Sequence, residues 1–199
     1  MPNFKFEVDA DGIALITWDM PGRSMNVIDA SVTEELAQLV DKVANDNAIK
    51  GAVVPSGKDS FCGGADLTML ERMSATYTDL AKREGAEAAN RMVFEESRKL
   101  SQLYRRIEKS GKPWVAAING TAMGGGFELC LACHHRVASD NPKTRLGLPE
   151  VKVGLFPGAG GTQRVARMLP PADARQLLRK GDQIKTDRAK AMKLIDAVV

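Results

Sequence analysis

Short apolar runs, rich in β-branched residues, recur along the chain and predict buried strands. Asp11–Gly12 separates the first two of these runs, and an Asp-Gly pair between apolar runs indicates a hairpin. The runs lie at Phe4–Val8, Ile13–Trp18, Gly51–Pro55 and Trp114–Ile118, and two shorter strands are expected near Arg136–Ala138 and Arg145–Leu148. Helical patterns fall between them, so the order of elements predicts an α/β domain.

The helices are predicted from apolar residues that recur every three or four positions. Ser31–Glu34 has the spacing of a capping box, which marks the start of a helix. A charged stretch from about Asp79 to Lys109 is helix-prone, and its apolar residues form one stripe. Further helices are expected near Phe127–Cys133, from about Thr162, over Pro171–Gly181 and over Thr186–Leu194, before a strand-like end, LIDAVV.

The composition of the chain argues against several functional classes of protein. The 199 residues fit one domain better than two, and a hydrophobic content of 44% is enough to bury a core. The net charge of +3 is too balanced for a dedicated nucleic-acid binder. No apolar run approaches the ~20 residues that span a bilayer, and no export or transit signal opens the chain. Because an odd number of cysteines argues against a disulfide framework, we expect a cytoplasmic protein.

Three familiar signatures nearly occur and fail on inspection. Gly51–Lys58 has five residues between its glycines where a phosphate-binding loop has four, and Gly158–Gln163 ends in Gln where a dinucleotide fingerprint needs Gly or Ala. Cys130–His134 matches the haem-attachment pattern, but it lies on an apolar helix where cysteine packs as a small hydrophobe. The only histidines are adjacent in sequence, so no metal site is predicted.

Three other segments fit together chemically: Ser60–Leu67, Asn119–Leu129 and Leu146–Thr162. In the first two, a turn of small residues joins a predicted strand to a predicted helix. Such turns leave backbone N–H groups unpaired at the positive end of a helix. Two such turns facing each other would form an oxyanion hole.

Two glutamates accompany these turns. Glu128 follows the triple glycine on an otherwise apolar helix, and Glu150 follows Pro149 in the next apolar segment. A lone glutamate on a helix is most often a solvated surface residue. However, burying an unpaired carboxylate is costly, which favours a function when two of them occur in apolar surroundings. The residues alone leave open a catalytic carboxylate pair and two surface glutamates beside ordinary turns.

These segments also carry a family resemblance. SFCGGADLTML, AINGTAMGGGFELCLAC and GLPEVKVGLFPGAGGTQRVARML resemble the crotonase superfamily, the enoyl-CoA hydratases and isomerases. The similarity is greatest to the N-terminal hydratase part of a multifunctional fatty-acid β-oxidation α-subunit. It implies Glu128 and Glu150 as catalytic residues, Ala65 and Gly125 as backbone N–H donors to the thioester carbonyl, and Ser24, Met25, Gly63 and Gly64 as substrate-binding residues.

The resemblance implies an α/β crotonase-like spiral of repeated β-β-α units. We expect residues 1–199 to form one core domain of this kind. We expect this domain to be a fragment of a longer chain and to lack the C-terminal helices that relatives have. It implies hydration of 2-enoyl-CoA thioesters, with Glu128 activating water and Glu150 serving the Cα proton. Coenzyme A belongs to the substrate, and no separate cofactor or metal is expected. A trimer-based homo-oligomer or a place in a multifunctional β-oxidation complex is expected, without nucleic acid or a membrane span.

Two alternative functions stay open at this point. One is an isomerase that shifts a 3-enoyl double bond without hydration, and the other is an acyl-CoA-binding or assembly module without turnover. The sequence also departs from the family pattern. Lys193 stands in a turn where relatives usually have Gly, and His134 or His135 stands where many have Asp.

Overall fold

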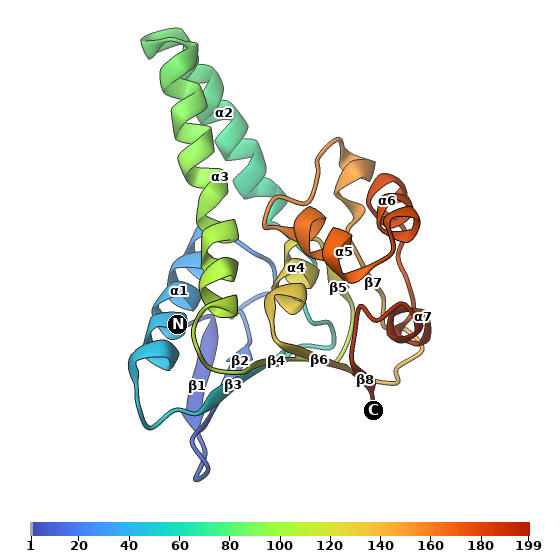
Figure 1. Cartoon of the computed structure of the whole chain (residues 1–199). Helices are drawn as coiled ribbons and strands as arrows, with labels where there is room; N and C mark the ends of the chain where they lie inside the picture. Colours follow the sequence, from blue (N-terminus) through green and yellow to red (C-terminus); the bar gives the residue numbers. More distant parts are fainter. Residues whose placement is uncertain (1) are drawn as a thin grey trace.

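The computed structural model describes residues 2–199, in which six strands form the main sheet (Figure 1). The strand order is β1-β2-β3-β4-β6-β8. β1 and β2 are antiparallel, and all other neighbouring strands are parallel. The strands are β1 (Phe4–Val8), β2 (Ile13–Trp18), β3 (Gly51–Pro55), β4 (Trp114–Ile118), β6 (His135–Ala138) and β8 (Ala197–Val198). The bounds of β1 to β4 are those predicted from the sequence.

Parallel neighbours require crossover connections, and the helices provide them. α1 (Ala30–Asn45) joins β2 to β3, α2 (Leu67–Glu84) and α3 (Ala86–Glu108) join β3 to β4, and α4 (Gly125–Ala132) lies between β4 and β6. α3 contacts both α1 and α4, and the three helices lie beside one another over the sheet (Figure 1). A second, two-stranded parallel sheet consists of β5 (Ala122–Met123) and β7 (Leu146–Gly147).

α4 lies at the centre of the molecule, and each of its eight residues is buried. An enclosed helix is apolar around its whole circumference, which explains the run of small and hydrophobic residues in this part of the sequence. Cys130 and Cys133 belong to this buried surface as free thiols. Glu128 is the one charged residue of α4, and it is only 2% exposed. A buried carboxyl in such a helix needs hydrogen-bond partners from elsewhere in the fold.

The start of α1 differs from the prediction. The N-cap is Asp29, whose Oδ1 accepts a hydrogen bond from the Val32 N–H at 2.8 Å, and Ser31 lies inside the helix. The Ser31 hydroxyl donates to the same carboxylate at 2.8 Å. The capping-box interpretation was therefore wrong, because an equally good N-cap residue stands two positions earlier.

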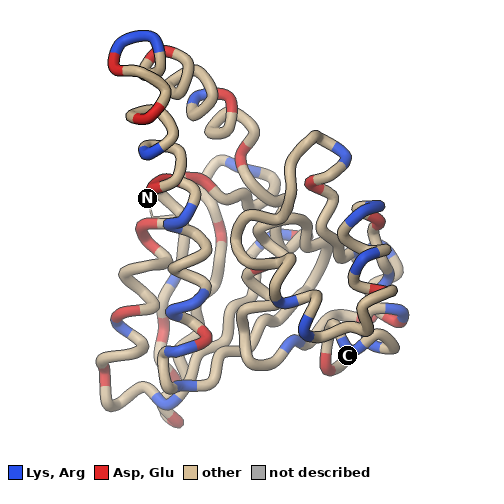
Figure 2. The backbone as a smooth tube through the Cα atoms, turned by 45° about the horizontal axis from the view of Figure 1, so that its top comes forward, with Lys and Arg blue, Asp and Glu red and all other residues tan. Residues whose placement is uncertain are grey.

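The charged stretch from about Asp79 to Lys109, predicted to be helix-prone, belongs to two helices. α2 begins at Leu67, where the Asp66 side chain caps the N–H groups of Thr68 and Met69, and Gly85 separates α2 from α3 with φ +91°. The hairpin of α2 and α3 projects from the body of the protein (Figure 1). α2 has no buried residue, and both helices carry interspersed positive and negative charges (Figure 2). Only the second half of α3, with Leu103 and Ile107, enters the core.

From Pro149 onward the chain consists of short helices and one strand. They are a 3-10 helix η1 (Pro149–Val153), α5 (Gly161–Met168), α6 (Pro171–Lys180) and α7 (Thr186–Ala191), followed by β8. Gly181 closes α6 in the left-handed conformation, as predicted, and β8 pairs with β6. Lys193 has φ +61° and is the only non-glycine residue with positive φ among residues 2–199. None of the helices in this range has the length and apolar character that a membrane crossing requires.

Candidate active site

Two glycine-containing turns, one after β3 and one after β4, meet in the structure. Gly64 and Gly124 both have positive φ, +105° and +51°. A Cβ atom on Gly124 would lie only 3.7 Å from the Gly64 Cα, and one on Gly64 would lie 3.4 Å from the Met123 carbonyl oxygen. The two backbones therefore approach each other with no room for intervening side chains.

Each turn presents at least one unpaired backbone N–H. The segment at Ile28 pairs with the first turn, donating to the Gly64 carbonyl at 2.8 Å and accepting from the Asp66 N–H at 2.8 Å. This ladder bypasses the N–H of Ala65, which donates to no acceptor within residues 2–199. Gly125 is the first residue of α4, a position whose N–H has no acceptor in its own helix. Both donors are thus available to an incoming oxygen.

Glu128 is held one turn into α4 by a loop from the last third of the chain. Its Oε1 accepts hydrogen bonds from the N–H groups of Ala159 at 2.9 Å and Gly161 at 2.7 Å. Burial, and to a lesser degree the charge of Glu150, raise the pKa of Glu128 to about 7 against the lowering effect of the two N–H donors and Arg164. The carboxyl is therefore both protonated and ionised in appreciable amounts near neutral pH.

Glu150 approaches the same place from η1. Its side chain is half-buried, and burial raises the pKa of its carboxyl. Its Oε2 is shielded from solvent and has no hydrogen-bond partner within residues 2–199. Its Oε1 lies 3.2 Å from the position of a Cβ on Gly124, and Glu128 Oε2 lies 3.8 Å from the position of a Cβ on Gly125. The two carboxyl groups and the two free N–H groups therefore gather around the N-terminus of α4.

The triple glycine is required by this close packing. A Cβ on Gly125 would stand 2.7 Å from the Ile28 Cδ1, and one on Gly126 would stand 2.5 Å from the Cys62 Cβ. Real Cβ atoms do not approach other atoms so closely, so any side chain here would displace its neighbour. Glycine at these positions is what lets the two turns and the carboxyl groups share one small volume.

The residues predicted to bind substrate lie at the edge of this site. The Met25 Sδ lies 2.6 Å from the position of a Cβ on Gly63, whose N–H donates to the Asn26 carbonyl at 2.9 Å. Met25, Gly63 and Gly64 are thus brought together with Ala65. Ser24 is exposed on the same loop.

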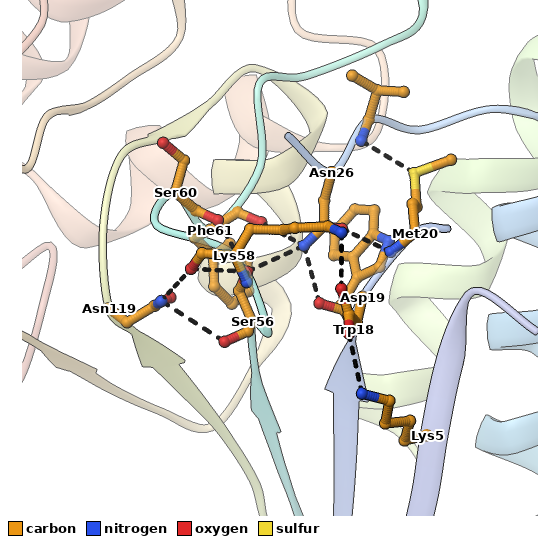
Figure 3. A network of polar contacts seen from close by, with 11 residues as sticks. Lys5, Trp18, Asp19, Met20, Asn26, Ser56, Lys58, Ser60, Phe61 and Asn119 are labelled. Carbon is orange, nitrogen blue, oxygen red and sulfur yellow. Dashed lines mark hydrogen bonds and ion pairs between the residues drawn. The ribbon is translucent and has the colours of Figure 1, made fainter. Parts of the chain in front are cut away.

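This loop is anchored by a buried asparagine that the sequence did not reveal as important (Figure 3). The Asn26 side chain is fully buried and donates to the Trp18 carbonyl at 2.9 Å, the Ser56 hydroxyl at 3.0 Å and the Phe61 carbonyl at 3.2 Å. Its Oδ1 accepts from the Met20 N–H at 3.0 Å. One amide therefore ties the loop to the ends of β2 and β3 and to the first glycine turn.

The loop that holds Glu128 was also missed. Arg164, 9% exposed, donates from Nη1 to the Ala159 carbonyl at 2.8 Å and from Nε to Glu108 at 2.8 Å. The signal was present in the sequence, because glycines directly before a helix leave free N–H groups. These glycines were grouped within Leu146–Thr162, but their N–H groups were not assigned to Glu128. Within residues 2–199 no three His, Cys, Asp or Glu side chains cluster in a way that could hold a metal ion.

Comparison with known proteins decides the family. The family model described as enoyl-CoA hydratase/isomerase matches residues 9–199. The chain belongs to the enoyl-CoA hydratase/isomerase family. This membership confirms the resemblance drawn from the three sequence segments.

Two curated relatives of this family member illustrate the similarity. The fatty acid oxidation complex subunit alpha of Shewanella amazonensis is 44% identical over 190 residues, which are 95% of this chain and 25% of the relative. The same subunit of Idiomarina loihiensis is 41% identical over 197 residues, or 98% of this chain and 26% of the relative. The chain therefore spans about a quarter of the length of these relatives.

Solved structures agree on the fold of this enoyl-CoA hydratase/isomerase family member. The crystal structure of an enoyl-CoA hydratase from Geobacillus kaustophilus superimposes with a TM-score of 0.85 at 27% identity, covering 100% of this chain and 68% of that one. The enoyl-CoA hydratase from Bacillus anthracis gives 0.82 at 28% identity, covering 99% of this chain and 70% of that one. The predicted crotonase-like α/β fold is thereby confirmed.

Proposed function

We propose that this chain is the hydratase part of a fatty-acid β-oxidation α-subunit and adds water across the double bond of 2-enoyl-CoA thioesters. The observation that carries the proposal is the arrangement at the N-terminus of α4, where a buried and a half-buried carboxyl group meet two unpaired N–H donors. Hydration needs these parts, because negative charge builds on the thioester oxygen while protons move at Cα and at the attacking water.

The N–H groups of Ala65 and Gly125 receive the thioester oxygen in this proposal. As water attacks Cβ, charge shifts through the conjugated system to that oxygen and forms an enolate-like state. Fixed donors at this point are worth a few kcal/mol each, because they need no reorganisation during the reaction. The Gly125 donor is also the positive end of α4, which adds to the stabilisation of the oxygen.

The two glutamates divide the proton transfers. Ionised Glu128 takes a proton from water as the hydroxyl bonds to Cβ, and protonated Glu150 gives a proton to Cα. At the end Glu128 holds a proton and Glu150 has lost one, so a proton must return before the next turnover. The raised pKa values of both carboxyl groups, about 7 for Glu128, support proton transfer by this pair, because a carboxyl group with a raised pKa can exchange a proton near neutral pH. The order of the two roles is the one that the family resemblance implies.

Substrate binding is assigned to the edge of the same site. Ser24, Met25, Gly63 and Gly64 line the approach of the coenzyme A part, and their closeness to Ala65 supports this placement. The acyl group arrives activated as a thioester, and backbone N–H groups polarise its carbonyl. The proposed reaction therefore requires no metal and no cofactor apart from the coenzyme A of the substrate.

We also propose a domain organisation, an assembly and a cellular location for this chain, based on its relatives. Residues 1–199 form one crotonase-like core domain, which works in a trimer-based homo-oligomer or in a multifunctional β-oxidation complex in the cytoplasm. The relatives' description as alpha subunits of a fatty acid oxidation complex supports this assignment. The family description also includes isomerases, so the same site is proposed to shift the double bond of 3-enoyl-CoA as a secondary activity.

The test is glutamine substitution of each glutamate in the intact protein. Glu128→Gln and Glu150→Gln keep the shape of the side chains and remove the transferable protons. Each is expected to lower the hydration rate about 10³-fold, because the proton transfer assigned to the substituted residue can then no longer occur. The measurement is the loss of ultraviolet absorbance of a short 2-enoyl-CoA.

Exposed Glu95 on α3 provides the matched control, and Glu95→Gln should leave the rate unchanged. A 3-enoyl-CoA assay on the same proteins separates hydration from isomerisation. Near-parental hydration by either site variant would overturn the two-carboxylate proposal. Tight thioester binding without turnover by the parent protein would instead support a binding module.

A further inference from the structure

Tyr104 links α3 to the turn that carries the Gly125 donor. Its side chain is 1% exposed, and its hydroxyl donates a buried hydrogen bond of 2.9 Å to the Gly125 carbonyl oxygen. The chain has two tyrosines. The other, Tyr77 on α2, donates an exposed hydrogen bond of 3.2 Å to Asn90 and lies in the projecting hairpin. Only Tyr104 therefore reaches the site.

The turn needs such an anchor because it has almost no side chains of its own. Gly124, Gly125 and Gly126 follow one another, and glycine has the widest conformational freedom of any residue. Side chains restrict Gly125 from one direction, where a Cβ would meet Ile28 at 2.7 Å and Leu100 at 3.7 Å. These apolar contacts limit how far Gly125 can move, but they do not set the directions of its N–H and C=O groups. The Gly125 N–H shares a peptide plane with the Gly124 carbonyl, which accepts from the Glu128 N–H at 2.9 Å, and the Tyr104 hydrogen bond holds the next peptide plane through the Gly125 carbonyl. The two bonds together fix the backbone on both sides of the Gly125 Cα.

We propose that Tyr104 is a positioning residue that orients the Gly125 N–H toward the thioester oxygen. This inference rests on the proposed function and adds a residue to it that touches neither substrate nor the reacting atoms. The hydroxyl is suited to the task because burial raises the pKa of Tyr104 well above its usual value, which keeps the proton in place at working pH. Small displacements of a donor matter, since a shift of about 1 Å in a catalytic group can cost about 10²-fold in rate.

The experiment compares Tyr104→Phe with the matched control Tyr77→Phe in the intact protein, using a short 2-enoyl-CoA. Tyr104→Phe is expected to lower kcat about 5- to 20-fold and to change KM less than about twofold, because the donor acts mainly in the transition state. Tyr77→Phe is expected to change neither. A structural role alone would lower thermal stability and alter KM and kcat together.

A spectroscopic readout tests the donor directly. A saturated acyl-CoA labelled with carbon-13 at the thioester carbonyl binds without reacting, and the infrared frequency of that carbonyl reports the strength of its hydrogen bonds. The frequency should fall on binding to the parent and to Tyr77→Phe, and fall less on binding to Tyr104→Phe. A kcat within twofold of the parent and an unaltered carbonyl band in Tyr104→Phe would overturn the inference while leaving the proposed function standing. A parent protein that does not hydrate enoyl-CoA would overturn both.

Discussion

Glu128→Gln should make the protein more stable at neutral pH while it removes activity. Burial raises the pKa of this carboxyl from 4.5 to about 7. The folded protein therefore holds the Glu128 proton more tightly than the unfolded chain does. Protonated Glu128 therefore adds to the free energy of unfolding at low pH. This contribution is lost as the pH rises from about 4.5 to about 7, because the Glu128 carboxyl ionises more easily in the unfolded chain. Glutamine fills the same space without ionising.

The size of the effect follows from the shift. Each pKa unit corresponds to about 1.4 kcal/mol, so a rise from 4.5 to about 7 costs about 3 kcal/mol of stability at pH 8 and about 1 kcal/mol at pH 5. Glu128→Gln should recover this cost. The variant should therefore exceed the parent in stability by about 2 kcal/mol more at pH 8 than at pH 5.

The assay is urea unfolding of parent and variant at pH 5, 6, 7 and 8, followed by circular dichroism. Glu95→Gln, at an exposed position, serves as the control and should give a difference that varies little with pH. A difference for Glu128→Gln that is constant with pH, or that is larger at pH 5 than at pH 8, would show that the carboxyl is not held with a raised pKa. The reasoning from burial would then be refuted.

Two further predictions concern pH and backbone strain. The value of kcat/KM should rise with pH along a limb centred near pH 7, because Glu128 must be ionised to take a proton from water, and a limb that survives in Glu128→Gln would contradict this assignment. Lys193→Gly should raise the free energy of unfolding by about 1 kcal/mol, or Tm by about 2–4 °C. The reason is that exposed Lys193 has φ +61°, a backbone conformation in which glycine is unstrained. An unchanged or lower Tm would refute this prediction.

The sequence pattern predicted an element correctly where a few neighbouring residues are enough to determine that element's structure. β1 to β4 are short runs rich in β-branched or aromatic residues, which favour strands, and their bounds were predicted correctly. The end of α6 at Gly181 was predicted for the same kind of reason, since few residues other than glycine adopt that conformation. The break at Gly85 was missed, because an exposed charged helix continues on both sides and the apolar pattern there is weak.

For the candidate site, the sequence determined less, and the tertiary structure determined more, than for the strands and helix ends. The sequence determined which residue types were available: two turns of small residues, and two glutamates in apolar segments. It could not determine that Ala159 and Gly161 hold Glu128, or that Tyr104 holds Gly125, because these partners lie 31, 33 and 21 positions apart along the chain. Hydrogen bonds of this kind depend on how the helices pack, and no local spacing encodes them. The raised pKa of Glu128 has the same origin, since burial of its carboxyl is a property of the tertiary structure alone.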